Sequence, residues 1–232
     1  MSETAPLTVA SDVLTWLAEN GSRKIAEGNA RFALPVDVDG VSVPAMRAQT
    51  RTIGTDHDLA RDLWHIGGYE RRMMAILLAD PKRMDRMEAD AWTSEFDNWA
   101  LCDTACFHLY RRTAFRWEVV RPWAGEDAEF VRRAAFAMLW ALAVHDKTAP
   151  DERFTEHFDL FRQHSSDARN YISKAIDMAL RAIGKRNLAL NEVGCLIAVE
   201  LKSSDNRTAS SIGRHVLSEL RSEKVRSKLG RP

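Results

Sequence analysis

One short pattern recurs along the chain at a nearly constant spacing: a basic residue followed by small and apolar residues with helical periodicity. It begins at Arg72, Arg133, Lys174 and Arg214. The second and third copies are 41 residues apart and the third and fourth are 40 apart, whereas 61 residues separate the first two and leave room for another helix. A period near 40 with two or three helices per repeat predicts stacking of the HEAT or armadillo type, which provides a concave face for a long ligand. The alternative is a coincidental spacing within an irregular helical bundle.

Apolar residues recur three and four positions apart through most of the sequence, which indicates helices. Before the helix that contains Leu59–Trp64, Thr55 followed by Asp58 resembles an N-terminal capping arrangement, and Pro44 suits the first turn of an earlier helix. The segment Val38–Val43 is the best candidate for a strand, but a single strand makes no sheet, so the fold class is predicted as all-α. Further helices are predicted at Glu70–Ala79, Glu88–Phe96, Asn98–Arg111, Ala114–Ala124, Asp127–Val144, Asp151–His164, Arg169–Ile183, Leu190–Lys202, Thr208–Leu220 and Val225–Leu229.

Composition limits the classes of protein to which the chain can belong. With 232 residues, 45% of them hydrophobic and 28% charged, it is an ordinary globular protein with enough residues for a sizeable core. We expect one domain over residues 1–232, with residues 1–40 as an N-terminal cap and 221–232 as a basic tail. No apolar segment is long enough to cross a membrane, and the sequence MSETAPLTVASDV lacks the pattern of a signal peptide. Three cysteines without a secretory context indicate reduced thiols in a cytoplasmic protein.

Charge is distributed unevenly, although the whole chain is neutral. Residues 169–232 contain 13 Lys and Arg against 6 Asp and Glu, a net charge of +7, and the sequence KVRSKLGRP near the end is strongly basic. This excess favours contact of the C-terminal part with phosphates. A solvated helical face followed by a frayed tail explains the same charge.

The segment from Phe96 to Phe107 contains the most informative constellation. On a helix Asp103 shares one face with Trp99, Cys102, Cys106, Phe107 and Tyr110, so a carboxylate interrupts an otherwise apolar stripe. One interpretation is a structural Asp that bonds to a neighbouring helix or an arginine; the other is a carboxylate in a partly dry cleft that acts on a cationic substrate. Cys102 and Cys106 are better interpreted as small buried residues than as metal ligands, because no second ligand pair follows.

Other catalytic signatures give no support to competing chemistries. His145, Asp146 and Lys147 are adjacent, which favours a polar helix end over a catalytic pair. The sequence lacks the patterns GxGxxG, GxxxxGK[ST], HExxH and GxSxG, so nucleotide hydrolysis, zinc-protease and α/β-hydrolase chemistry are not indicated.

The sequence resembles the DNA alkylation repair family of AlkD-type, HEAT-like-repeat glycosylases. The resemblance covers roughly residues 40–220 and is carried by the segments GVSVPAMR, DLARDLWHIGGYERRMMAILLADP, FDNWALCD, FVRRAAFAMLWALAVHDK and ISKAIDMALRAIGKRN, in the order of the family. It implies a right-handed superhelix of antiparallel helix pairs that holds duplex DNA in a basic concave cleft. It also implies a monomeric, monofunctional glycosylase that releases 3-methyladenine and 7-methylguanine from alkylated double-stranded DNA. No metal, organic cofactor or membrane is implied, and the enzyme is expected in the cytoplasm, at the bacterial nucleoid when it acts.

The resemblance also implies roles for individual residues. The Trp-x-x-x-Asp pair of the family falls on Trp99 and Asp103, and its cleft arginine falls on Arg133, or on Arg132 if the alignment slips by one residue. Met178 occupies the place of a second cleft tryptophan, which is a departure from the family. Two further departures or partial matches are Ala100, where the family often has an acidic residue, and Phe32, which matches an aromatic DNA contact. The cationic candidates for phosphate contact are Arg169, Lys174, Arg181, Lys185 and Arg186.

These assignments lead to a hypothesis and two alternatives. Asp103 stabilises the oxocarbenium character that develops on the sugar, Trp99 packs on the deoxyribose, and Arg133 binds a flanking phosphate while the lesion stays stacked. The first alternative is a binder of damaged or branched DNA without excision activity, which the change to Met178 favours. The second is a protein-interaction solenoid, the common use of such arrays.

Overall fold

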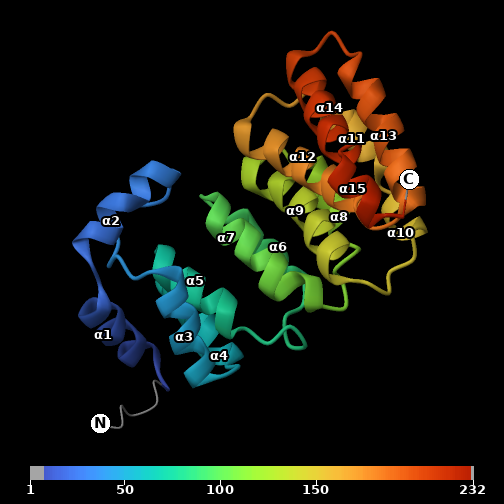
Figure 1. The fold of residues 1–232 in the computed structure, drawn as a ribbon. Coiled ribbons are helices and arrows are strands. Elements are labelled where there is room, and N and C mark those ends of the chain that lie inside the picture. Colours follow the sequence, from blue (N-terminus) through green and yellow to red (C-terminus); the bar gives the residue numbers. More distant parts are fainter. Residues whose placement is uncertain (1–7, 231–232) are drawn as a thin grey trace. The chain divides into compact units, whose positions relative to one another are not determined.

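The structure, a computed structural model, describes residues 8–230. Residues 1–7 and 231–232 lie outside the described residues. They belong to the N-terminal sequence that lacks the pattern of a signal peptide and to the predicted basic tail. Every regular element in the described part is a helix, so the prediction of an all-α fold is confirmed. The chain divides into two compact units, Met1–Phe115 and Arg116–Pro232, which are drawn in Figure 1. Among the described helices, none combines the length and apolarity that a membrane crossing requires.

The first unit is organised around the antiparallel helices α4 (His57–Ile66) and α5 (Tyr69–Leu78). Gly67 and Gly68 join them in a tight connection, in which both glycines have the positive φ angles that other residues avoid. Trp64 of α4 stacks on Trp92 with ring centroids 4.2 Å apart, which anchors the core of this unit. The other elements are α1 (Ala10–Asn20), α2 (Arg23–Asn29), η1 (Ala30–Phe32), α3 (Val43–Ile53), α6 (Arg86–Ser94), α7 (Trp99–Thr104), η2 (Ala105–Leu109) and η3 (Tyr110–Arg112).

The assignment of Val38–Val43 as a candidate strand is wrong. The segment is irregular and leads directly into α3, and its polar backbone groups find partners other than a strand ladder. The N–H groups of Gly40 and Val41 both donate to Oε1 of the buried Glu70, at 2.8 and 3.2 Å. Gly40 has φ +83° and a Cβ there would lie 2.2 Å from the Ser22 carbonyl oxygen, so the glycine is required by a loop and not by a strand.

The start of α4 also differs in detail from the prediction. Asp56, rather than Thr55, is the N-cap residue, and its Oδ1 accepts a hydrogen bond from the Leu59 N–H at 3.0 Å. A carboxylate satisfies an unpaired N–H of the first turn and also interacts favourably with the positive end of the helix dipole. In α3, Pro44 lies in the first turn as expected, after the N-cap residue Ser42.

The second unit is built on three long helices that lie side by side, α9 (Glu129–His145), α12 (Asn170–Gly184) and α14 (Arg207–Leu220). The helix α13 (Leu188–Lys202) packs against α14 and α12. The recurring basic residues Arg133, Lys174 and Arg214 lie on α9, α12 and α14 in turn, which explains the 40-residue spacing as the step between neighbouring repeats. The shorter elements are α8 (Val120–Gly125), α10 (Glu152–Thr155), α11 (Phe158–His164) and α15 (Glu223–Lys228).

Two predicted helices of this unit are shorter or divided. The prediction of Ala114–Ala124 is realised only in α8, because the residues before Val120 form turns. The predicted helix Asp151–His164 is divided at His157, which leaves the helical conformation with φ −109° and ψ 5°. Phe154 is fully buried three residues before this break, and its ring packs edge to face on Trp117 with the ring centroids 5.1 Å apart. The break in the helix therefore coincides with tertiary packing of an aromatic pair.

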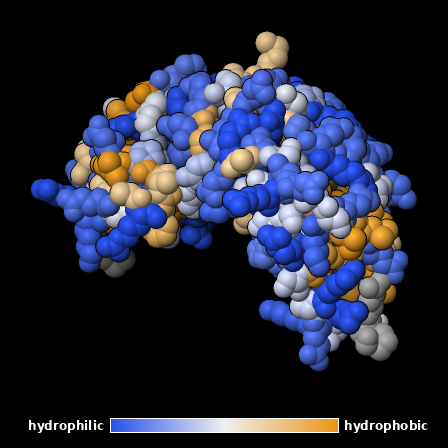
Figure 2. All heavy atoms as spheres, turned by 90° about the horizontal axis from the view of Figure 1, so that it is seen from above, coloured by the Kyte–Doolittle hydropathy of each residue, from blue (hydrophilic) through white to orange (hydrophobic). Residues whose placement is uncertain are grey.

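The face of the molecule drawn in Figure 2 is largely hydrophilic. On the face drawn in Figure 2, apolar residues are exposed in small separate groups among polar ones. The large apolar side chains with the greatest exposure are scattered along the described chain, and Phe32 at 63% and Leu196 at 62% are among them. Isolated exposed apolar residues are normal for globular proteins and do not define a binding face.

Candidate nucleic-acid interface

Trp99 is held firmly at the first position of α7. The side-chain oxygen of the N-cap residue Asn98 accepts hydrogen bonds from the N–H groups of Ala100 and Leu101, each at 3.0 Å, and this fixes the start of the helix. The indole N–H of Trp99 donates to the Phe32 carbonyl oxygen at 2.8 Å. The structure therefore brings together Trp99 and Phe32, two residues that the sequence analysis placed at the site separately. The Phe32 side chain itself is exposed at the end of η1.

Asp103 lies one turn after Trp99 on the same side of α7. Trp99, Asp103 and Phe107 are all half-buried, whereas Cys102 and Cys106 are completely buried. The stripe predicted from the sequence is thus split into a core strip and a boundary strip, and the carboxylate belongs to the boundary. A carboxylate at such a boundary is neither fully solvated nor fully desolvated, so its charge acts more strongly than it would in water.

An unusual helical turn follows this pair directly. Residues Ala105–Leu109 form the π-helix η2, and Tyr110–Arg112 continue as a 3-10 helix where the sequence predicted one regular helix to Arg111. Single π turns occur frequently at functional sites. In η2, the Nε2 atom of His108 lies 3.2 Å from the Leu77 carbonyl oxygen. Burial lowers the pKa of His108 below its usual value. No sequence signal indicated this turn.

Arg133 is buried in the second unit, with 4% of its surface exposed. Its Nη1 donates to the Tyr171 carbonyl oxygen at 2.6 Å, and its guanidinium carbon lies 6.0 Å from the centroid of the Tyr171 ring. The first turn of α12 therefore holds the arginine of α9 in place. Its role as a phosphate ligand stays a prediction.

Arg132, the alternative to Arg133, belongs to a different network. It forms ion pairs with Asp167 at 2.9 Å and Asp127 at 3.1 Å and also donates to the Ala124 carbonyl oxygen. Arg169 bonds to the same Asp167 at 2.6 Å. Hydrogen bonds from Arg169 and then Arg132 outweigh burial and hold the pKa of Asp167 far below its usual range. This network connects the segment before α9 with the segment before α12. In the structure, Arg132 and Arg169 therefore stabilise the contact between these two segments.

The other predicted cations differ in their availability. Lys174 is exposed on α12. Arg181 pairs with Asp177 and Glu219, and Lys185 also pairs with Glu219. Arg186 donates to the carbonyl oxygens of Ala143, Asp146 and Ala149 and lies 4.4 Å from the centroid of the Phe154 ring. Its bonds to Ala143 and Asp146 cap the end of α9, which needs donors for its last carbonyl groups. The contacts of these residues with phosphate stay predictions.

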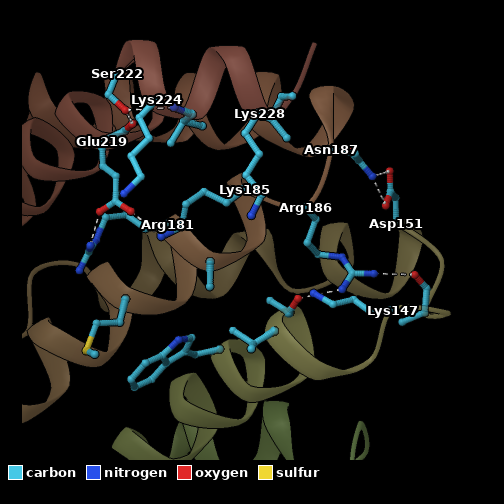
Figure 3. A pocket seen from close by; sticks show the side chains of 18 residues that line it. Lys147, Asp151, Arg181, Lys185, Arg186, Asn187, Glu219, Ser222, Lys224 and Lys228 are labelled. Carbon is cyan, nitrogen blue, oxygen red and sulfur yellow. Dashed lines mark hydrogen bonds and ion pairs between the residues drawn. The ribbon is translucent and has the colours of Figure 1, made fainter. Parts of the chain in front are cut away.

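Met178 lies between two cavities of the second unit. It is half-buried on α12, and together with Arg181 it lines both a cavity of about 880 Å³ and a neighbouring one of about 680 Å³. The larger cavity is shown in Figure 3. Three of its lining lysines, Lys147, Lys224 and Lys228, were not among the predicted site residues; the only signal for the last two was the basic sequence near the C-terminus.

The site shows no sign of a metal centre. In the range 8–230, no three His, Cys, Asp or Glu side chains come together as metal ligands. Cys102 and Cys106 are buried in the core, and Cys195 is half-buried.

Comparison with known proteins identifies the class of fold and then the family. A solved structure covers 97% of this chain, and the chain covers 97% of it, with a TM-score of 0.77 and 19% sequence identity. It is described as a new family of proteins related to the HEAT-like repeat DNA glycosylases with affinity for branched DNA structures. The fold is therefore of the HEAT-like repeat class, as the spacing of the basic residues predicted.

The sequence also matches a family model. Residues 13–193 match the model of the DNA alkylation repair enzyme family, and the chain belongs to this family. None of the curated proteins is significantly similar to the sequence.

Proposed function

We propose that this protein is a DNA glycosylase that removes cationic N3- and N7-alkylpurines, such as 3-methyladenine and 7-methylguanine, from duplex DNA. The observation that carries the proposal is the pair formed by Trp99 and Asp103. The two residues share the boundary strip of α7, and the indole is fixed by its hydrogen bond to Phe32. Membership of the DNA alkylation repair enzyme family supports the same reaction.

The chemistry of the lesion explains why few residues suffice. Alkylation at N3 or N7 gives the purine a positive charge, so the base departs as a neutral alkylpurine when it takes the electron pair of the N-glycosidic bond. The sugar gains oxocarbenium character, as in the hydrolysis of other glycosides. Water then adds to C1′ and loses a proton, which leaves an abasic site and the free base. A carboxylate held at a partly buried boundary stabilises the positive sugar and orients the attacking water.

Each named residue has a distinct proposed part in this reaction. Asp103 is the carboxylate that faces the sugar, and Trp99 packs its ring on the deoxyribose. Arg133 binds a phosphate of the bound DNA, since the planar guanidinium matches the oxygen atoms of a phosphate. Met178 lies at the place of a second cleft tryptophan and packs on the DNA with less area than an indole.

The proposal predicts the effect of neutralising Asp103. Asp103→Asn is expected to reduce release of 3-methyladenine and 7-methylguanine from methylated duplex DNA by at least 100-fold, because removal of one electrostatic contact to a transition state typically costs that much. Asp62→Asn removes the same charge from an exposed position of α4 and is expected to leave release unchanged. The measurement is chromatography of the freed bases. Release by Asp103→Asn at the wild-type rate would reject the assignment.

A second candidate function is supported by Met178. If the missing indole has cost the protein its excision activity, the fold would serve to bind DNA of unusual structure. The solved structure of the same fold described above belongs to proteins with affinity for branched DNA. Wild-type protein that binds a four-way junction more tightly than a linear duplex and releases no alkylpurine would favour this second function.

A further inference from the structure

The larger cavity of the second unit is strongly basic. It lies between the end of α9, the end of α12 and α15, and Figure 3 shows Lys224 and Lys228 reaching from α15 toward Arg181 and Lys185. Its lining also includes the apolar residues Val144 and Ala182. Six of its lining residues carry a positive charge and two carry a negative one; the six cations are Lys147, Arg181, Lys185, Arg186, Lys224 and Lys228.

The two acidic groups of the cavity are already engaged. Glu219 is shared by Arg181 and Lys185, and Asp151 accepts two hydrogen bonds from Asn187 at 2.9 Å. Burial alone would raise the pKa of Glu219, but the hydrogen bonds from Lys185 and Arg181 together with their charges lower it, so Glu219 stays ionised. These two carboxylates therefore do not pair with the remaining lysines of the lining.

Three lysines that line the larger cavity form no ion pair within the described part of the chain. Among residues 8–230, no carboxylate lies within ion-pair distance of Lys147, Lys224 or Lys228. Lys224 and Lys228 are four residues apart on α15, so they are separated by one helical turn, about 6 Å along the axis. Phosphates of one strand follow one another about every 3.4 Å along the axis of duplex DNA, so a strand lying along α15 presents more than one phosphate to the two lysines.

The neighbouring cavity extends this positive surface across α12. Besides Met178 and Arg181, which both cavities share, its lining includes Lys174, Arg207 and His215. Its one carboxylate, Asp177, bonds to Arg181 at 2.6 Å and to His215 at 2.9 Å. Two adjoining basic cavities form a path, and a path suits a polymer of phosphates better than a single small anion.

We propose that this path binds the sugar–phosphate backbone of a DNA strand, with Lys224 and Lys228 of α15 contacting two of its phosphates. The inference rests on the proposed function, because it places DNA on the second unit. It assigns α15 a binding role that is separate from the reaction at Asp103. The apolar residues that line the larger cavity provide a surface for the deoxyribose rings between the phosphates.

The test compares two double variants with equal loss of charge. Lys224→Ala/Lys228→Ala removes the two cavity lysines. Lys202→Ala/Arg226→Ala removes two exposed cations that line neither cavity, and Arg226 lies on the same helix, α15. Affinity for an unmodified duplex is measured by fluorescence anisotropy at several salt concentrations, and thermal melting establishes that each variant is folded.

The expected result is a change in the salt dependence of binding. Each phosphate contact contributes a slope of about −0.9 to the plot of log K against log salt for duplex DNA, so loss of two contacts makes the slope less steep by about 1.8. The control variant is expected to keep the wild-type slope. Equal slopes for the cavity variant and wild type would overturn the inference, and so would an equal change in both variants.

Failure of this inference can be told apart from failure of the proposed function. The salt dependence of binding to an unmodified duplex is measured without any excision, so the effect of the two lysines is independent of the reaction at Asp103. A wild-type protein that excises the base but shows no effect of the two lysines would overturn only the role of α15. A wild-type protein that binds no DNA would overturn both.

Discussion

Asp103 and Asp167 show how position decides what a carboxylate can do. Asp103 lies on the boundary strip of α7, whereas Asp167 is enclosed by two arginines that hold it ionised. The resemblance to the family located Asp103 by its spacing from Trp99. Nothing local in the sequence could assign Arg132 to Asp167, since the two lie 35 residues apart and meet only in the folded chain. The same reason hid the engagement of Arg186 with the end of α9.

The network around Asp167 predicts how stability depends on pH. A carboxylate whose pKa is lowered by folding contributes stability above its unfolded pKa of about 3.9, and that contribution is lost as the pH falls toward the folded value. Asp167→Asn is therefore expected to destabilise the protein at pH 7 by about 1–2 kcal/mol. The difference should shrink below about pH 4. Melting curves across pH measure it, with the exposed Asp205→Asn as control; a difference that grows in acid would contradict the account.

Met178 permits a direct test of the role proposed for its position. Met178→Trp introduces an indole at a position that borders two cavities and so has room for it. We expect release of 7-methylguanine to rise about fivefold, since an aromatic face next to a developing cation contributes about 1 kcal/mol. Met178→Leu supplies the control for side-chain shape. Equal rates for the tryptophan and leucine variants would show that this position does not limit the reaction.

At the scale of helices, the sequence predicted positions well and interruptions poorly. The long helices α9, α12 and α14 appear close to their predicted limits, because amphipathic periodicity persists over many residues. The errors fall where tertiary contacts overrule local preference. Glu70 binds the loop at Gly40 and Val41, Phe154 packs where the predicted helix Asp151–His164 divides, and the π-helix η2 interrupts the helix after Asp103.

The packing of α13 on α14 depends on a missing side chain. A Cβ at Gly213 would lie 2.3 Å from the Lys202 nitrogen and 2.5 Å from the Ala198 carbonyl oxygen, both backbone atoms that cannot yield easily. Gly213→Ala is expected to destabilise the protein by about 1–3 kcal/mol, as other overpacked contacts do. Gly28→Ala, with nothing within 4 Å of its Cβ, is expected to be neutral or slightly stabilising. Equal melting temperatures for the two variants would contradict this close contact.

At the scale of the whole molecule, zero net charge conceals an uneven distribution of charge. Positive charge is in excess in residues 169–232, which supply most of the cationic lining of both cavities from α12, α14 and α15. The sequence located this excess of charge. It could not tell cations that pair with a carboxylate from cations that do not. That distinction depends on partners from other helices, such as Glu219 for Arg181 and Lys185.

The most direct test of the glycosylase proposal is a single-turnover measurement on a duplex with one 7-methylguanine. The rate of base release and the affinity for the same duplex are measured together for wild type and Asp103→Asn. The account predicts release by wild type and a rate at least 100-fold lower for the variant, with affinity changed only a few-fold, because the carboxylate acts on the sugar in the transition state. Rates within twofold of each other, or no release by wild type, would contradict it.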